Sequence, residues 1–114
     1  MAYAMILRSP NDLGFAAVQH FLALAPTLSG SWRATMDYDE EGDRYVTLSP
    51  ADGQDAFMVC RVNGVLSVIH TARDNAGLMT FDPHLCDSID AAKRRLIEIT
   101  ARRGALPVAL DEAA

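Results

Sequence analysis

The chain is poor in cysteine, in tryptophan and in basic residues. Of its 114 residues two are cysteine and one is tryptophan, and 15 acidic residues outnumber 10 lysines and arginines, which gives a formal net charge of −5 at pH 7. Cys60 and Cys86 lack the Cys-x-x-Cys spacing of redox and zinc motifs, so we expect two buried, reduced thiols. The acidic balance argues against nucleic acid as the partner, because phosphate binding needs a positive surface.

Long apolar runs are also missing. No stretch approaches the roughly 20 apolar residues that cross a bilayer, and Met1 to Leu7 lacks the basic region that opens a secretory signal. We therefore expect a cytoplasmic protein with no membrane partner. Half of the residues are hydrophobic, which is enough for one domain over residues 1–110 that needs no disulfide or structural metal, with a frayed tail at 111–114.

The first element that the sequence predicts is a helix. Ser9 suits the N-cap and Pro10 the first helical position, while Pro26 disfavours helical geometry in the residue before it. This pattern predicts a helix from Pro10 to about Ala25. The apolar stretch 1–7 before it fits either an edge strand or an extension of the helix.

A β-hairpin is predicted next. Apolar and polar residues alternate from Trp32 to Tyr38, and Gly42 suits the left-handed position of a three-residue turn. That turn pairs Met36 with Val46, which leaves the hairpin with one apolar and one polar face.

A second hairpin is marked by Asn63-Gly64, the strongest short turn signal in the sequence. It joins strands at 56–62 and 65–71, and both faces of this hairpin are largely apolar, so something must cover the second one. The first helix, the N-terminal stretch and a second copy of the chain are the candidate covers, and we expect a homodimer. The candidate dimer face consists of Phe57, Val59, Leu66 and Val68.

A second helix is predicted near the end of the chain. Asp87 or Ser88 caps it, and Gly104 and Pro107 end it. One stripe of this helix is apolar and consists of Ile89, Ala92, Leu96 and Ile99. Between the second hairpin and this helix we expect a loop, a short edge strand at 78–81 and a turn.

These elements together predict an α+β fold. An antiparallel meander sheet of four to five strands is flanked by an N-terminal and a C-terminal helix, in the order α-β-β-β-β-α. The helices and the sheet form a two-layer sandwich.

Metal binding and catalysis have weak support in the sequence. The acidic run 37–43 resembles the start of a calcium loop, but Leu48 stands where the bidentate glutamate belongs. The two cysteines, with His70 and His84, match no zinc spacing, and a thiol nucleophile is left with Cys86 beside His84. We assign no catalytic residue, no metal ligand and no cofactor, and the balance favours a protein that is not an enzyme.

Charge is separated along the chain. The second helix is locally basic and fits either a solvated face or a docking face for an acidic protein. The basic residues are Lys93, Arg94, Arg95, Arg102 and Arg103. The predicted loop at 72–86 holds the candidate residues of a ligand pocket, which are Arg73, Asp74, Asn75 and His84.

The informative features are therefore surfaces. We expect a small cytoplasmic protein-binding or regulatory module, of the inhibitor, immunity or accessory-subunit type, that acts through surface contacts with another protein. The alternative is a small-molecule-binding protein or small enzyme with a pocket between the sheet and the 72–86 loop. A flat apolar patch favours the first, and a concave pocket with convergent polar groups favours the second.

Overall fold

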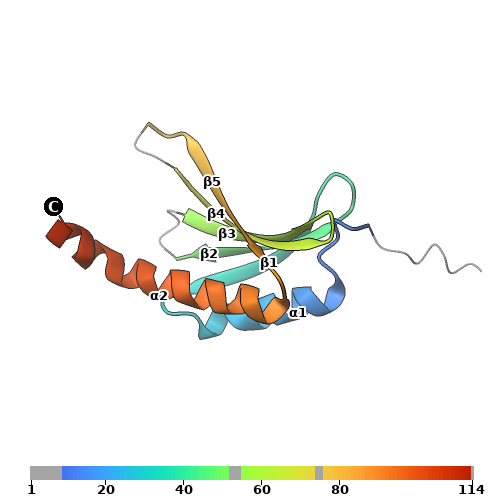
Figure 1. Cartoon of the computed structure of the whole chain (residues 1–114), viewed down its shortest axis with the longest axis horizontal. Coiled ribbons are helices and arrows are strands. Elements are labelled where there is room, and N and C mark those ends of the chain that lie inside the picture. The colour runs from blue at the N-terminus through green and yellow to red at the C-terminus, as the bar shows by residue number, and fades with distance from the viewer. Residues whose placement is uncertain (1–8, 52–54, 74–75, 114) are drawn as a thin grey trace, which may run out of the picture.

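The chain folds as two layers, one of strands and one of helices (Figure 1). A computed structural model describes residues 9–51, 55–73 and 76–113, and side chains as far as Arg102. The elements are α1 (Phe15–Leu24), the short 3-10 helix η2 (Ala25–Thr27), β1 (Trp32–Tyr38), β2 (Arg44–Pro50), β3 (Asp55–Val62), β4 (Val65–Arg73), β5 (Met79–Cys86) and α2 (Ile89–Ala113). The five strands form one antiparallel sheet in the order β1-β2-β3-β4-β5, which confirms the predicted meander with a helix before and after it.

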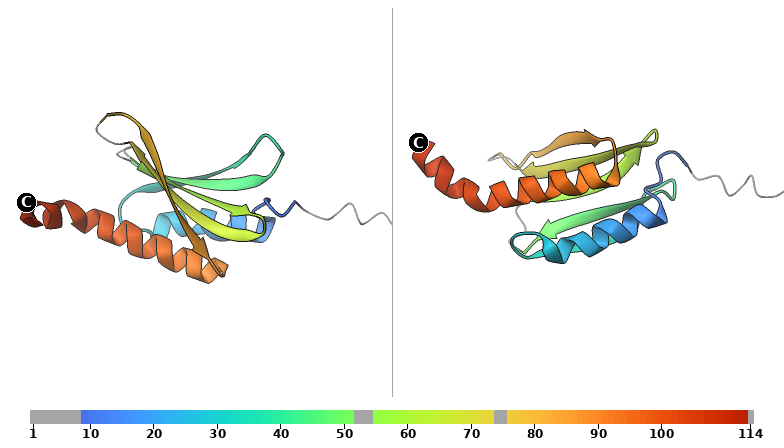
Figure 2. Two further views of the ribbon diagram at one scale, coloured as in Figure 1. Left: turned by 45° about the horizontal axis from the view of Figure 1, so that its top comes forward. Right: turned by 60° about the horizontal axis from the view of Figure 1, so that its bottom comes forward.

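Both helices lie on the same side of the sheet (Figure 2). α1 contacts β1 and β2, α2 contacts β4 and β5, and the two helices contact each other. We call this side of the sheet the helix-covered face and the other side the helix-free face. Side chains alternate between the two faces along each strand, so the register decides which residues enter the core.

Local turn chemistry explains both predicted hairpins. In the first, Met36 pairs with Val46, and Gly42 has the positive φ of 84° that its turn position requires. In the second, Asn63 and Gly64 both have positive φ, which is the requirement of a type I′ turn. The predicted register of both hairpins is confirmed.

The predicted start of the first helix is wrong. α1 begins at Phe15 and not at Pro10, because tertiary contacts bind Pro10 and Asp12 to other parts of the chain. The Asp12 carboxylate binds Arg44, and the carbonyl oxygen of Pro10 accepts a hydrogen bond from the Gly64 N–H at 2.7 Å.

The last strand is longer than predicted. β5 runs from Met79 to Cys86, through Asp82 and Pro83, where the sequence predicts a turn. Pro83 fits inside β5 because β5 is an edge strand, and a proline on an edge removes no hydrogen bond from the sheet when its nitrogen faces the open side.

The second helix is also longer than predicted. Of the two caps that the sequence predicts, Asp87 and Ser88, it is Ser88 whose Oγ accepts a hydrogen bond from the Ala91 N–H at 3.1 Å. Its backbone continues through Gly104 and Pro107 to Ala113, beyond the strands of the sheet (Figure 1). A glycine inside a helix costs only about 1 kcal/mol, and a proline bends a helix without always ending it. The right-hand view of Figure 2 shows this bend.

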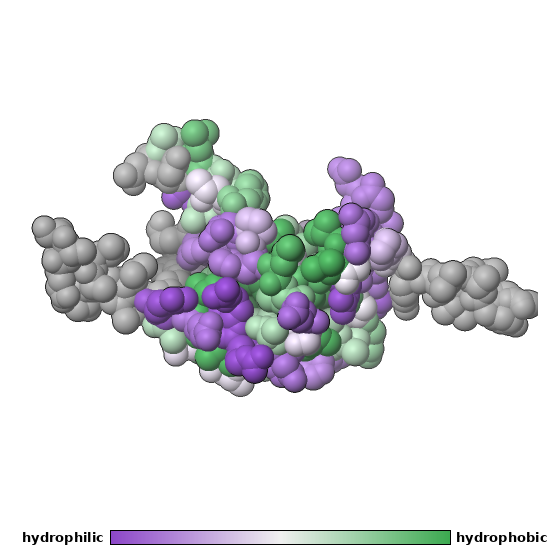
Figure 3. Space-filling view, in the orientation of Figure 1, coloured by the Kyte–Doolittle hydropathy of each residue, from purple (hydrophilic) through white to green (hydrophobic). Residues whose placement is uncertain are grey.

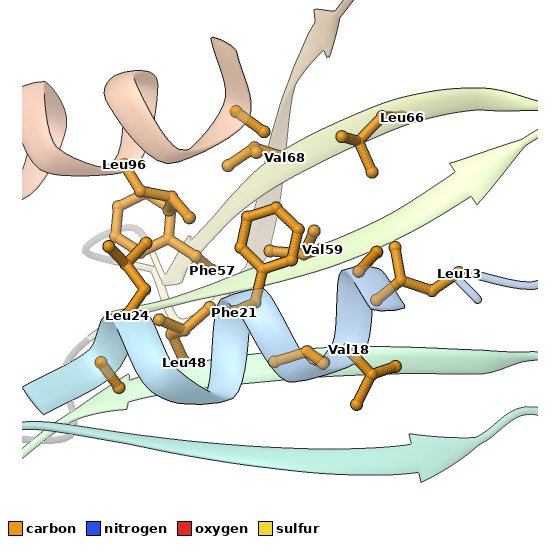
Figure 4. Close-up of a cluster of buried hydrophobic side chains, with 14 of the residues drawn as sticks. Leu13, Val18, Phe21, Leu24, Leu48, Phe57, Val59, Leu66, Val68 and Leu96 are labelled. Carbon is orange, nitrogen blue, oxygen red and sulfur yellow. The ribbon is translucent and has the colours of Figure 1, made fainter. Parts of the chain in front are cut away.

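One hydrophobic core joins the two layers (Figure 4). Its fully buried side chains include Phe21 from α1, Phe57 from β3 and Leu96 from α2. The Phe57 ring lies 5.5 Å from the Trp32 ring and 4.6 Å from the His70 ring, distances typical of favourable aromatic pairs. The core therefore depends on both helices and on the central strand.

The candidate dimer face is part of this core. Phe57, Val59 and Val68 are fully buried and Leu66 is 2% exposed. The sequence predicts that one face of the second hairpin needs a cover, and the two helices provide it. These four residues are not available for a dimer contact, so their assignment to one is corrected.

Replacing Phe21 by alanine should destabilise the fold strongly, whereas the same change at Phe15 should not. Phe21 is fully buried, and Phe15 is 65% exposed on the same helix. We expect Phe21→Ala to lower the free energy of unfolding by about 3–5 kcal/mol, through lost burial and the cavity left behind, and Phe15→Ala by less than about 0.5 kcal/mol. Urea denaturation followed by circular dichroism measures both, and equal losses would contradict this description of the core.

Candidate functional site

The helix-free face is polar over β1 and β2 and mostly apolar over β3 and β5, and between these two strands β4 places Ile69 on it, flanked by Ser67 and Thr71. One row of paired residues crosses it and consists of Thr35, Thr47, Met58, Ile69 and Pro83. Met58 and Ile69 are only half-buried, because both helices lie on the other side of the sheet. An apolar sheet surface left open in this way is the feature to which a function can be assigned.

Strand β5 extends the apolar surface to the edge of the sheet. Met79, Phe81 and Leu85 face the helix-free side and are 44%, 63% and 72% exposed. Figure 3 shows hydrophobic surface at the outer end of the β4–β5 hairpin. We define the apolar band as Met58, Ile69, Met79, Phe81 and Leu85.

The sequence contains a signal for this band that the prediction of 78–81 as a short strand missed. Apolar residues occupy every second position from Met79 to Leu85, and polar residues stand between them, which is the pattern of a strand with two different faces. The Asp82-Pro83 pair is typical of a turn and hides this alternation.

A hollow of about 570 Å³ lies on the helix-free face at one end of the sheet. Strand residues form its floor, which consists of Tyr45, Met58, Cys60, Val62 and Ile69. The loop between β1 and β2 supplies an acidic rim, which consists of Asp39, Glu41 and Asp43. Asn11, Arg44 and Arg61 complete the wall. The volume falls in the range of about 300–1,000 Å³ that is usual for ligand pockets.

An ion pair between Asp12 and Arg44 holds the wall of the hollow in place. Arg44 Nη2 lies 2.8 Å from Asp12 Oδ2, and the two side chains are 11% and 5% exposed. Asp12 also accepts hydrogen bonds from the backbone N–H of Arg44 at 2.8 Å and from that of Gly14 at 3.1 Å. The hydrogen bond to Asp12 raises the pKa of Arg44, so the guanidinium stays charged. The pair therefore ties the turn before α1 to the first residue of β2.

The described chain begins at the rim of this hollow. Ser9 Oγ donates a hydrogen bond to Asp43 Oδ2 at 3.3 Å. The Pro10 carbonyl oxygen accepts a hydrogen bond from the Gly64 N–H. The Asn11 side chain accepts one from the Asn63 N–H at 2.7 Å. The start of the described chain is thus bound to both loops that border the hollow.

The basic residues of α2 lie in the other layer. Arg94, Arg95 and Arg102 are exposed and Lys93 is half-buried. The Arg103 side chain lies outside the described part of the structure. The inner face of α2 carries the predicted apolar stripe, with Ala92 and Leu96 buried and Ile89 and Ile99 packed against them.

Of the candidate ligand residues, the two that the structure describes, Arg73 and His84, are not brought together. Arg73 and His84 lie on opposite faces of the β4–β5 hairpin. Arg73 donates a hydrogen bond to the Gly77 carbonyl at 3.0 Å and so binds the turn of this hairpin. Asp74 and Asn75 lie outside the described residues. The 72–86 segment is mostly strand, so it does not form the predicted pocket loop.

The two thiols lie on opposite faces of the sheet. Cys60 lines the hollow, whereas Cys86 pairs with Leu66 on the helix-covered face, where its Sγ is 3.5 Å from the His84 carbonyl oxygen. Burial raises the pKa of both thiols. This shift is opposite to the one that prepares a cysteine for nucleophilic attack.

Neither a metal site nor a relative supplies a function directly. Across the described ranges, no three His, Cys, Asp or Glu side chains are grouped so that they could hold a metal ion. The helices in these ranges are too short or too polar to cross a membrane. Comparisons with protein-family models, curated proteins and solved structures find no match for this chain. The function is therefore argued from the surface of the molecule.

Breaking the Asp12–Arg44 pair should reduce stability far more than breaking a surface pair. Arg44→Met removes the guanidinium that faces the buried Asp12 carboxylate, and such losses amount to about 3–5 kcal/mol. Arg95 and Glu98 are 3.9 Å apart, with side chains 44% and 59% exposed, so Glu98→Gln should change the free energy of unfolding by less than about 1 kcal/mol. Chemical denaturation measures both variants. A loss for Arg44→Met no larger than that for Glu98→Gln would refute this role of the pair.

Proposed function

We propose that this chain is a small protein-binding module that captures a partner protein on the helix-free face of its sheet. The observation that carries the proposal is β5, whose Met79, Phe81 and Leu85 side chains face away from the helices and are 44–72% exposed. Contiguous apolar surface of this kind marks interaction sites in soluble proteins. Met58 and Ile69 continue it toward the centre of the sheet.

The surroundings of the apolar band support the same proposal. On the same face, β1 carries Arg33, Thr35 and Asp37, all exposed. An apolar centre with a polar, solvated rim is the usual composition of an interface between proteins that also exist apart. The polar residues of β1 would set the orientation of the partner, and the apolar band would supply the buried area.

The band favours contact through side chains over addition of a further strand. β5 has an open edge, but Pro83 near its middle has no N–H group, and a proline on an edge weakens pairing with another strand. A partner would instead lay an amphipathic helix or the face of a sheet on Phe81 and Leu85.

A second copy of the chain is one partner that fits this surface. Symmetric dimers use the same patch on both chains, and the apolar band is the exposed surface that would supply it, since the residues first assigned to a dimer lie in the core. We also propose a cytoplasmic setting, because Cys60 and Cys86 are both free thiols and free thiols persist in a reducing compartment.

Docking of an acidic protein on α2 is a second candidate function. The observation that favours it is the exposure of Arg94, Arg95 and Arg102 in a chain whose net charge is −5. Surface charges of this kind accelerate association and select the partner more than they strengthen the complex. This surface and the apolar band belong to different layers, so substitutions test them separately.

Removing two large side chains from the band should abolish capture of the partner. A tagged chain carrying Phe81→Ser and Leu85→Ser is compared with the unaltered chain and with Phe15→Ser, which removes an exposed phenylalanine from α1. Proteins retained from a lysate of the source cell are quantified by mass spectrometry. We expect recovery to fall at least about tenfold for the double variant, because interface anchors contribute about 2 kcal/mol or more each, and to stay unchanged for Phe15→Ser.

Light scattering of the same purified proteins separates the two kinds of partner. If the unaltered chain and Phe15→Ser are dimers and the double variant is a monomer, the partner is a second copy of the chain. Equal partner recovery and an unchanged mass for all three proteins would contradict binding through the band.

Reversing charge on α2 should slow association with an acidic partner. Arg94→Glu with Arg95→Glu replaces two exposed cations, so the association rate measured by surface plasmon resonance should fall and lose its dependence on salt. Thermal unfolding should not change, since both positions are exposed. An association rate that is unaffected by the double reversal would remove α2 as a docking surface.

A further inference from the structure

The two edges of the sheet differ in how open they are to another strand. β1 and β5 are the edge strands, and β5 contains Pro83, which has no N–H group. β1 runs from Trp32 to Tyr38 without proline or glycine, and it has no bulge, since each of its residues has one partner in β2. Proline and bulges usually protect a sheet edge from other chains. The stretch 1–7, predicted as an edge strand or an extension of the first helix, lies outside the described residues.

The backbone groups of β1 that point away from β2 include those of Ala34 and Met36. At one end of β1 the Asp39 N–H donates a hydrogen bond to the Asp43 carbonyl oxygen at 2.9 Å, and the hydrogen bond beyond its other end follows the same alternation. Residues of an antiparallel strand alternate between bonding to one neighbour and to the other. The odd-numbered residues of β1 therefore bond to β2, and the even-numbered residues point to the open edge.

The exposed side chains of β1 are symmetric about Thr35, with charges of opposite sign on its two sides. Arg33 lies two positions before it and Asp37 two positions after it, and all three are exposed on the helix-free face. Among the described residues, neither charged side chain has an ion-pair partner. If β1 pairs antiparallel with β1 of a second copy and Thr35 meets its own equivalent, each Arg33 lies opposite an Asp37. Opposite charges and threonine pairs both stabilise adjacent strands.

We propose that two copies of this chain associate through their β1 edges, in the register that places Thr35 at the two-fold axis. Ala34 of each copy then lies opposite Met36 of the other, and their outward N–H and carbonyl groups bond to each other. Arg33 and Asp37 fall at the non-hydrogen-bonded positions, where Cα atoms are only about 4.5 Å apart. Two five-stranded sheets become one continuous sheet.

This register is the one that uses the whole of β1. A two-fold axis requires one residue of β1 to meet its own equivalent. An axis one residue earlier or later would leave two residues of β1 without a partner in the other β1, and Arg33 would no longer lie opposite Asp37. The order of charges in β1 also favours a second copy over a strand of another protein, because β1 itself supplies the complementary charges at the required positions.

Side chains on the helix-covered face support the same contact. Ala34 and Met36 are half-buried and pack against the hydrophobic core, as does Leu22 of α1. In Figure 4, β1 runs beyond α1 at the border of the sheet. The two-fold axis is perpendicular to the sheet, so the helix-covered faces of both copies lie on the same side. The two cores then adjoin along β1, and these apolar side chains lose exposed surface.

The proposal goes beyond the function proposed above and does not depend on it. The apolar band lies toward β5, at the other edge of the sheet. A second copy bound at β1 therefore leaves the bands of both chains free for a different protein. Both bands face the same side of the joined sheet, so one dimer would hold two partner molecules.

Charge reversals test the register in the full chain. Arg33→Asp and Asp37→Arg each replace two attractive pairs by two repulsive ones. Each single variant should raise the Kd of the dimer, measured by sedimentation equilibrium, at least about tenfold. The double variant exchanges the two charges and should return the Kd to within about threefold of the unaltered value. Glu98→Arg, at an exposed position of α2, changes the net charge as Asp37→Arg does and should leave the Kd unchanged.

Mixing the two single variants tests the same pairing between different chains. Arg33→Asp leaves β1 with two acidic positions and Asp37→Arg leaves it with two basic ones, so every charged pair of a mixed dimer is of opposite sign. The mixture should dimerise at a concentration at which each variant alone is a monomer. A monomeric unaltered chain, or a mixture no more dimeric than its components, would overturn the proposal.

A proline at the edge tests the backbone contact. Ala34→Pro removes an N–H that points away from β2, so the pairing of β1 with β2 is kept. Dimerisation should be lost while the circular dichroism spectrum stays unchanged. If this variant does not fold, the mixing experiment still decides, because it leaves the backbone intact.

The variant with Phe81→Ser and Leu85→Ser separates this contact from the apolar band. It should remain a dimer even where it no longer recovers a partner from lysate, since recovery reports on the band and mass reports on β1. A dimer that is lost in this variant and kept in both charge reversals would overturn the proposal and assign the second copy to the band.

Discussion

The Asp12 carboxylate is the contact on which the arrangement of the two layers depends. It accepts hydrogen bonds from the guanidinium and from the backbone N–H of Arg44, and one of its oxygens binds the N–H of Gly14. The last residue before α1 and the first residue of β2 are therefore held by one side chain. This contact sets where the helix begins, how it meets the sheet, and how the wall of the hollow is built.

Side chains alternate between the two faces of each strand, so one face of the sheet enters the core and the other stays open to solvent. Phe57 and Val59 enter the core, while Met58 and Cys60, one position along, reach the helix-free face. Because both helices cover the same side, the apolar residues of the other side stay half-buried or exposed. The proposed binding surface is thus the consequence of apolar residues on both faces of β3 and on the helix-free face of β5, in a sheet that has helices on only one side.

Turn chemistry made the centre of the fold predictable, because Gly42 and the Asn63-Gly64 pair determine the registers of both hairpins locally. Where the prediction failed, contacts between distant residues decided the outcome. Ser9 was expected to cap the first helix, yet Ser9 and Asp12 bind residues of the first hairpin. The hollow was not predictable for the same reason, since its lining comes from four separate stretches of chain. The apolar band was predictable in principle from the alternation in β5, which Pro83 obscured.

The sequential order of the strands also determines how the chain can assemble during synthesis. Each strand pairs with the one made just before it, and such local pairing forms quickly. The helix-covered side of β4 is different, because its cover is α2, the last of the described elements. Until the ribosome has released that helix, Leu66 and Val68, which are buried in the finished fold, have no helix over them. That interval is the stage of biogenesis at which a chaperone would protect the nascent chain from aggregation.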